Sequence, residues 1–140
     1  MESLHASGRV RLLGVSNVSL EQLESLVGDA RVRPRFVQNR CYASQGWDHD
    51  VRQFCHAHEI VYQGFSLLTA NPEVLHHPLV IGLAARADAT AAQVVFGFAR
   101  AAGMLPLTGT SNAEHMKQDL ASADLTISPD AVQAIESLAG

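Results

Sequence analysis

Short apolar runs typical of buried β-strands alternate with segments of helical periodicity along the 140-residue sequence. The most compact run, Val10 to Val15, follows Gly8 and ends at Ser16 and Asn17. A β-branched and leucine-rich run between turn residues favours a strand that is buried on both faces. Because strands separated by helices usually pair in parallel through right-handed connections, the pattern constrains the chain to an α/β fold.

The alternation predicts four βα units. The four strands are expected at Val10 to Val15, Arg35 to Asn39, Ile60 to Phe65 and Met104 to Thr108. Helices are expected at Ser19 to Val27, after Asp48 as a plausible N-cap, at Ala91 to Ala102, at Ala113 to Ala121 and at Pro129 to Ala139. Four parallel strands alternating with helices make half of a (β/α)8 TIM barrel, and we expect one domain over residues 1–140.

Several local signals support these boundaries. Ser19, Thr90 and Ser128 are good helix N-caps, and Gly103 stands where a helix commonly ends in a left-handed turn. Residues 66–78 are predicted to form a loop. Because loops of that length inside a compact domain are often functional, ligand contacts are expected there.

Composition and charge exclude several classes of function. Net charge is −4, and the only local basic cluster consists of Arg31, Arg33, Arg35 and Arg40, so nucleic-acid binding is not expected. No apolar run approaches the roughly 20 residues needed to span a bilayer, and the first residues lack the features of a secretory signal. A cytoplasmic protein that does not bind membranes is therefore expected.

Metal binding is not expected either. The two cysteines, Cys41 and Cys55, lack the paired spacing of a zinc site and are interpreted as reduced thiols. No two histidines have the i, i+4 spacing of a helical metal site.

Several motifs occur in an order that resembles one enzyme family. They are Gly8-Arg-Val-Arg-Leu-Leu-Gly-Val-Ser-Asn17, then Gln38, then Ile60-Val-Tyr-Gln-Gly-Phe-Ser66, then Pro106-Leu-Thr-Gly-Thr-Ser-Asn-Ala-Glu-His-Met-Lys-Gln-Asp-Leu120. In order, spacing and strand placement they resemble the C-terminal half of the aldo-keto reductase barrel. The resemblance implies carbonyl reduction with NADP(H) or NAD(H) and a nicotinamide dinucleotide as ligand.

The same resemblance implies roles for residues at the strand ends. Ser16, Asn17 and Gln38 would hydrogen-bond the nicotinamide carboxamide, which offers both a donor and an acceptor. Phe65 stands where many family members stack a tyrosine on the nicotinamide ring. The alternative is purely structural: Ser16 and Asn17 turn the chain, Gln38 satisfies backbone groups, and Phe65 is a core aromatic.

Further positions would contact the rest of the dinucleotide. Ser66, Leu68 and Thr69 fall where the family contacts the pyrophosphate, although they could equally face water. On the adenosine side the implied contacts are Thr108, Gly109, Thr110, His115, Gln118 and Asp119. The helix that contains His115 could receive a phosphate at its N-terminus. Since many NADPH-preferring members carry a Lys and an Arg around this segment, preference for the 2′-phosphate is left open.

The acid-base residues of the family have no counterpart in this sequence. Its Asp, Tyr, Lys and His lie on the first four strands of the barrel, whereas here Tyr42, Tyr62 and Lys117 match none of those strand positions. The first eight residues resemble the end of the helix that precedes the fifth strand, so the chain is expected to begin inside a domain. We assign no catalytic residue and expect the chain to be inactive alone.

Three interpretations of function follow. In the first, the chain is an NAD(P)H-dependent oxidoreductase component completed by an N-terminal half-barrel on another chain. In the second, it is a non-catalytic half-barrel that binds or interacts. In the third, it is a homo-oligomer in which Tyr42, His49 or Asp50 has a new role. A half-barrel leaves two sheet edges unpaired and its inner face uncovered, so we expect it to pair with a second chain.

Overall fold

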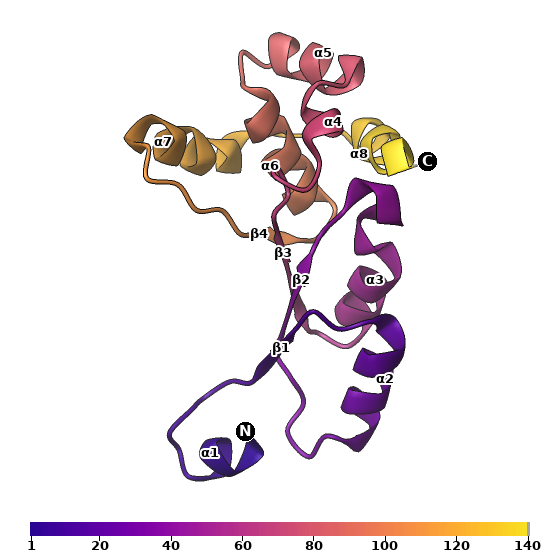
Figure 1. Cartoon of the computed structure of the whole chain (residues 1–140), viewed down its shortest axis with the longest axis vertical. Helices are drawn as coiled ribbons and strands as arrows, with labels where there is room; N and C mark the ends of the chain where they lie inside the picture. The colour runs from indigo at the N-terminus through magenta and orange to yellow at the C-terminus, as the bar shows by residue number, and fades with distance from the viewer. Residues whose placement is uncertain (140) are drawn as a thin grey trace.

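The computed structural model describes residues 1–139 and contains one parallel sheet of four strands in the order β1-β2-β3-β4. The strands are β1 (Gly14–Ser16), β2 (Phe36–Arg40), β3 (Val61–Phe65) and β4 (Leu105–Pro106). Helices separate successive strands, as Figure 1 shows. The predicted α/β fold, with four parallel strands alternating with helices, is therefore confirmed.

The helices fill the connections and the C-terminal region. The α-helices are α1 (Glu2–Ala6), α2 (Leu20–Asp29), α3 (His49–Ala57), α4 (Pro72–Leu75), α5 (Pro78–Arg86), α6 (Ala91–Ala101), α7 (Ala113–Ala121) and α8 (Pro129–Glu136). The 3-10 segments are η1 (Ala43–Asp48), η2 (Ser122–Asp124) and η3 (Ser137–Ala139). Of the helices in residues 1–139, none is by itself long and apolar enough to cross a membrane; only the α5–α6 pair together, bent by 95°, meets the criteria of length and composition.

Local capping explains why the predicted helices begin where they do. Ser19 accepts a hydrogen bond from the Gln22 N–H while the Gln22 side chain accepts from the Ser19 N–H, which is a complete capping box. Thr90 and Gln93 repeat this arrangement at the start of α6. Gly103 follows α6 with a φ of +82°, so the predicted left-handed turn is confirmed.

Several boundaries differ from the prediction. The strand expected at Val10 to Val15 begins only at Gly14, because that is where its single neighbour β2 starts to pair. The strand expected at Met104 to Thr108 is paired only at Leu105 and Pro106. The loop expected over residues 66–78 contains the short helix α4. The helix predicted to reach Ala139 ends at Glu136 and continues as η3.

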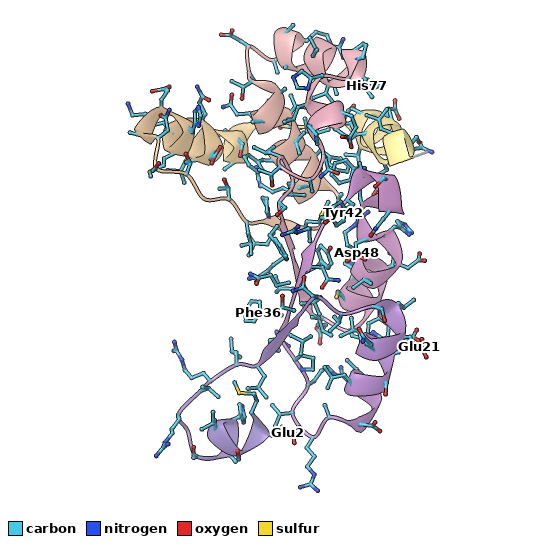
Figure 2. The ribbon with its side chains drawn as sticks, in the orientation of Figure 1. Glu2, Glu21, Phe36, Tyr42, Asp48 and His77 are labelled. Atoms are coloured by element: carbon cyan, nitrogen blue, oxygen red, sulfur yellow. The ribbon has the colours of Figure 1, made fainter. Side chains whose placement is uncertain are left out.

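The helices cover one face of the sheet and leave the other open. Val37 and Tyr62 are buried in the core. Phe36, in contrast, points away from α2 and α3 (Figure 2). On that open face Val61 and Leu105 are 40% and 46% exposed, respectively. A closed barrel fills this face with side chains, so half of the usual core lies uncovered here.

The core lies between the sheet and the helices. Its largest fully buried side chains are Trp47 and Phe98, whose rings meet edge to face with centroids 4.9 Å apart. Arg52 is also buried and donates to the carbonyls of Trp47 and Ala102 and to the carboxylate of Glu136. Arg52 thereby links η1, the end of α6 and α8, which are distant in sequence but pack together.

A buried asparagine ties the loop after β2 to the loop after β3. The Asn71 side chain accepts from the Ala43 N–H at 2.6 Å and donates to the carbonyls of Cys41 at 3.0 Å and Leu67 at 2.8 Å. It is 1% exposed, so water cannot replace these bonds. Both loops carry site residues, and Asn71 therefore fixes their relative position.

We expect Asn71→Ala to lower the free energy of unfolding by about 3 kcal/mol, because three buried backbone groups lose their partner. Asn112→Ala is the matched comparison, since Asn112 is exposed and caps α7. Its loss should cost only about 1 kcal/mol. Urea unfolding of both variants measures the difference, and equal losses would contradict the bracing role of Asn71.

Stability is also expected to fall in alkali because of two buried thiols. Burial raises the pKa of Cys41 from 9.0 to about 12 and that of Cys55 from 9.0 to about 11. A folded pKa above the unfolded value gives stability that is present below pH 9.0 and is lost as pH rises. At about pH 10 each thiol should have lowered the free energy of unfolding by about 1 kcal/mol, which urea unfolding measures. The Cys41→Ala, Cys55→Ala double variant should show a shallower decline, and an unchanged decline would contradict this origin.

Candidate functional site

The parallel sheet brings the carboxyl ends of its strands to one edge. Across the open face, Ser16 pairs in register with Gln38, Gln38 with Gln63, and Gln63 with Leu105. One step further toward the carboxyl end, Arg40 lies beside Phe65. In open and closed α/β sheets alike, ligands bind outside this edge of the strands.

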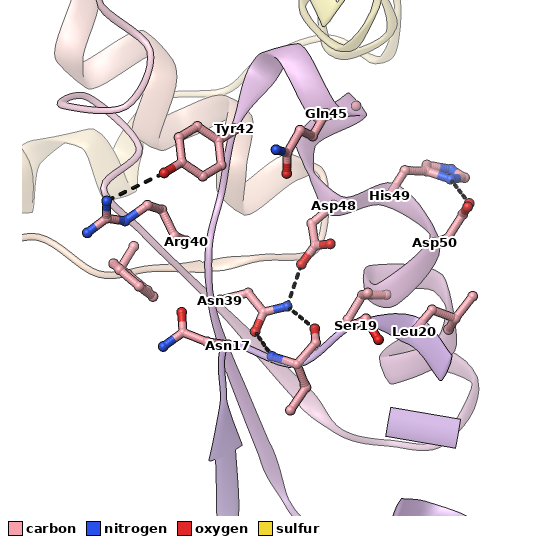
Figure 3. A pocket seen from close by; sticks show the side chains of 14 residues that line it. Asn17, Ser19, Leu20, Asn39, Arg40, Tyr42, Gln45, Asp48, His49 and Asp50 are labelled. Carbon is pink, nitrogen blue, oxygen red and sulfur yellow. Dashed lines mark hydrogen bonds and ion pairs between the residues drawn. The ribbon is translucent and has the colours of Figure 1, made fainter. Parts of the chain in front are cut away.

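The largest pocket of the described residues lies at this edge and has a volume of about 820 Å³ (Figure 3). Its walls come from the loop after β1, the end of β2 with η1 and the start of α3, and the end of β3. The lining residues are Asn17, Val18, Ser19, Leu20, Asn39, Arg40, Tyr42, Gln45, Gly46, Asp48, His49, Asp50, Val51 and Phe65. Polar donors and acceptors therefore lie around the rings of Tyr42 and Phe65.

A buried hydrogen-bond network shapes the wall of this pocket next to the helices. Asn39 accepts from the Val18 N–H at 3.0 Å and donates to the Val18 carbonyl and the Asp48 carboxylate, each at 2.8 Å. Tyr62 also donates to the Asp48 carboxylate, at 2.7 Å. Burial raises the pKa of Tyr62 most, and the neighbouring Cys41 and Asp48 raise it further. The hydroxyl therefore stays protonated and can donate this hydrogen bond.

The same network corrects one sequence expectation. Asp48 was predicted to cap α3, and it does occupy the N-cap position, but its side chain makes no cap hydrogen bond. Its backbone is left-handed, with a φ of +56°, and this turns the carboxylate toward Asn39 and Tyr62. Asp48 thus braces the site instead of the helix.

At the open side of the pocket Arg40 packs on Phe65. The guanidinium carbon lies 5.5 Å from the ring centroid, and Nη1 donates to the Tyr42 hydroxyl at 3.4 Å. Figure 3 shows Arg40, Tyr42 and Asn17 on the side of the pocket away from His49 and Asp50, which pair with each other at 3.1 Å.

The predicted nicotinamide contacts lie together at the ends of β1 and β2. The Gln38 carbonyl accepts from the Ser16 hydroxyl at 2.8 Å and from the Asn17 N–H at 3.0 Å. Asn17 has a φ of +54°, and its side chain lines the pocket. Ser16 and Gln38 neighbour the pocket on the open face of the sheet, and Phe65 forms part of its wall.

The predicted phosphate and adenosine contacts line two further pockets along the same edge. The first, of about 370 Å³, shares Phe65 with the largest pocket and includes Ser66, Leu68 and Thr69. The second, of about 560 Å³, includes Thr110 and Asp119. Both pockets include Thr108 and Gly109, so the three cavities follow one another from β1 to α7.

Four predicted contacts do not line the pockets described above. Ser16 and Gln38 lie beside the first pocket on the sheet, and His115 and Gln118 lie on α7. At the start of α7 the Asn112 side chain accepts from the N–H groups of Glu114 and His115, at 2.8 Å and 3.3 Å. An anion at this helix end would have to share those donors or displace the cap.

The Asp119 side chain, on α7, accepts a hydrogen bond from the Thr108 hydroxyl at 2.8 Å.

The aldo/keto reductase family model matches residues 1–71. The chain belongs to the aldo/keto reductase family. It is 30% identical to an aldo/keto reductase of Synechocystis over 90% of this chain and 42% of that protein. It is 26% identical to mouse aldo-keto reductase family 1 member A1 over 99% of this chain and 45% of that protein.

Solved structures agree on the fold. An aldo-keto reductase from a deep-sea metagenome library superposes with a TM-score of 0.88 at 20% identity, covering 98% of this chain and 51% of that one. The aldose reductase of Schistosoma japonicum gives 0.88 at 18% identity, covering 98% and 44%. The chain thus spans about half the length of the aldo/keto reductases it matches, and its fold is a four-unit fragment of their TIM barrel.

Sequence reasoning missed Asn39 and Arg40 and misjudged Asp48. Alternation along β2 distinguishes the two faces, since Gln38 and Arg40 fall on one face and Asn39 on the other. The polar Asn39 on a buried face was the available signal, because such a group needs partners. No group of three His, Cys, Asp or Glu side chains that could hold a metal ion exists within residues 1–139.

We predict that Asp48 and Tyr62 are energetically coupled. In a double-mutant cycle of Asp48→Ala and Tyr62→Phe, the coupling in unfolding free energy should be about 1 kcal/mol or more, because the bond is partly buried and its acceptor is a carboxylate. Tyr42→Phe is the control, since the Tyr42 hydroxyl contacts Arg40 and not Asp48. Additive effects of Asp48→Ala and Tyr62→Phe would contradict the network.

Proposed function

We propose that this chain holds NADP(H) or NAD(H) along the carboxyl edge of its sheet and serves as the cofactor-binding part of an oxidoreductase that reduces carbonyl compounds. The observation that carries the proposal is the succession of three pockets along that edge. They contain an aromatic ring at one end and hydroxyl and backbone donors at the other. Bound there, the dinucleotide supplies the hydride for reduction.

In this proposal the nicotinamide lies at the ends of β1 and β2. Ser16, Asn17 and Gln38 contribute hydroxyl and amide groups that can hydrogen-bond both ends of a carboxamide. The Asn17 side chain faces the pocket from a left-handed backbone position, where it is not committed to capping α2. Phe65 offers a flat face for the ring. Together these groups fix which face of the nicotinamide meets the substrate.

The phosphates and adenosine extend toward α7. Ser66 and Leu68 line the middle pocket, where the Ser66 hydroxyl can meet a phosphate. The adenosine end is assigned to Thr108, Gly109, Thr110, His115, Gln118 and Asp119. Among these, Thr108, Gly109 and Thr110 line the pocket beside α7, so they are the nearest donors. His115 and Gln118 would contribute from the exposed surface of α7.

The proton needed at the carbonyl oxygen is proposed to come from a group outside the cofactor-binding residues of this chain. Carbonyl reduction builds negative charge on that oxygen, so a proton donor must face it. Tyr62 is 2% exposed and its hydroxyl donates a hydrogen bond to Asp48, and the Lys117 side chain is 77% exposed on α7. We infer that the donor lies on a complementary half-barrel with four further βα units.

The sheet supports that inference. Within residues 1–139, β1 and β4 each have an unpaired edge, and no helix covers the face carrying Gly14, Phe36 and Val61. A complementary parallel half would pair both edges and bury this face. This chain covers 51% and 44% of two matched aldo-keto reductase structures. A complementary half-barrel would fill the remaining part of the barrel.

Cofactor binding tests the proposal directly. We expect NADPH and NADH to bind the chain in a calorimetric titration, with Asn17→Ala and Phe65→Ala each weakening binding about tenfold through lost hydrogen bonding or stacking. Glu24→Ala, on the exposed side of α2, is the control and should leave affinity unchanged. Failure of both nucleotides to bind would refute the proposed function.

Turnover and partnership are tested separately. The chain alone should show no carbonyl-dependent NADPH oxidation, and robust turnover would contradict an external proton donor. Purification from the native source should recover a protein with four further βα units, and adding it should restore turnover. A stable species made only of this chain would instead favour the non-catalytic or self-associated interpretation.

A further inference from the structure

Arg40 places a positive charge at the open side of the largest pocket. It is the last residue of β2, lies in register with Phe65 of β3, and is exposed. Its guanidinium rests on the Phe65 ring at 5.5 Å, and its Nη1 contacts the Tyr42 hydroxyl at 3.4 Å. These two contacts limit the motion of a side chain that otherwise has much rotamer freedom, so the charge is held at the pocket mouth.

This charge has no anionic partner among residues 1–139. The ion pairs of that region involve His49 with Asp50, Arg52 with Glu136, and Lys117 with Glu114. The nearby Asp48 carboxylate is used by Asn39 and Tyr62. Figure 3 shows Asp48 and Asp50 on the other side of the pocket from Arg40.

The chemistry of the guanidinium defines what it would accept. It carries five N–H donors in a planar fork that matches a carboxylate with two parallel hydrogen bonds, and only one contact, to Tyr42, engages that fork here. Asn17 and Gln45 line the same pocket and add amide donors around the open side. A ligand carboxylate can therefore approach Arg40 from the cavity.

We infer that Arg40, held by Phe65 and Tyr42, binds the carboxylate of an anionic carbonyl substrate. The inference rests on the proposed function, because Phe65 is also the proposed stacking surface for the nicotinamide. A substrate whose carboxylate binds Arg40 would have its carbonyl group beside the nicotinamide that stacks on Phe65. Its charged end and its reacting end would then both have a binding position. Arg40 is thus a specificity-determining residue that selects oxo-acids over neutral carbonyl compounds.

The test compares two ligands of similar shape, 4-carboxybenzaldehyde and its uncharged methyl ester, titrated by NMR into the full chain with and without NADPH. We expect the carboxylate to bind about tenfold more tightly than the ester, and Arg40→Gln to remove the difference. Arg86→Gln is the matched control, because Arg86 is an exposed arginine on α5 outside the three pockets. Tyr42→Phe should reduce the preference only in part.

Cofactor binding is measured separately, without the aldehydes, so three outcomes can be distinguished. Equal affinity for carboxylate and ester in a chain that binds NADPH would overturn the inference. Loss of NADPH affinity in Arg40→Gln, with the carboxylate competing against NADPH, would assign Arg40 to a cofactor phosphate and would also overturn it. An Arg40-dependent carboxylate preference in a chain that fails to bind NADPH would support anion recognition at Arg40 and refute only the reductase assignment.

Discussion

Parallel pairing of the four strands is the constraint on which the candidate site depends. Because all strands run in one direction, the loop after each strand emerges at the same edge. Asn17, Arg40, Phe65 and Thr108, which are far apart in sequence, thereby line successive pockets. Within residues 1–139 the sheet has only these four strands, so β1 and β4 each keep one unpaired edge.

Buried polar side chains set the shape of that edge. Asn39 and Asp48 join the loop after β1 to the start of α3, and Asn71 joins the loops after β2 and β3. Asn39 and Asn71 are buried and Asp48 is half-buried, and each is hydrogen-bonded to more than one group, so each specifies a particular loop geometry that hydrophobic packing alone would not. These residues position the polar groups proposed to bind the dinucleotide.

Local sequence signals predicted the strand and helix order because capping and periodicity act over a few residues. The α5 helix was missed, since it begins with Pro78 after a cap formed by His77 and stands next to a predicted loop. The length of β1 could not be read from its apolar run, because a strand extends only where its neighbour pairs. For the site, the strand-end residues were predicted through family motifs, whereas the contact of Arg40 with Phe65 depends on strand register. The role of Asp48 depends on a left-handed backbone that no sequence pattern indicated.

The central claim is that the carboxyl edge of this half-barrel holds a nicotinamide dinucleotide. Its most direct test is residue-resolved NMR of the isotopically labelled chain during addition of NADPH. The account predicts chemical-shift changes that run from Asn17 through Phe65 and Ser66 to Thr110, with little change at Cys55 and Gly103 in the pocket at the opposite end of the sheet. Shifts confined to that opposite pocket, or none at saturating nucleotide, would contradict it.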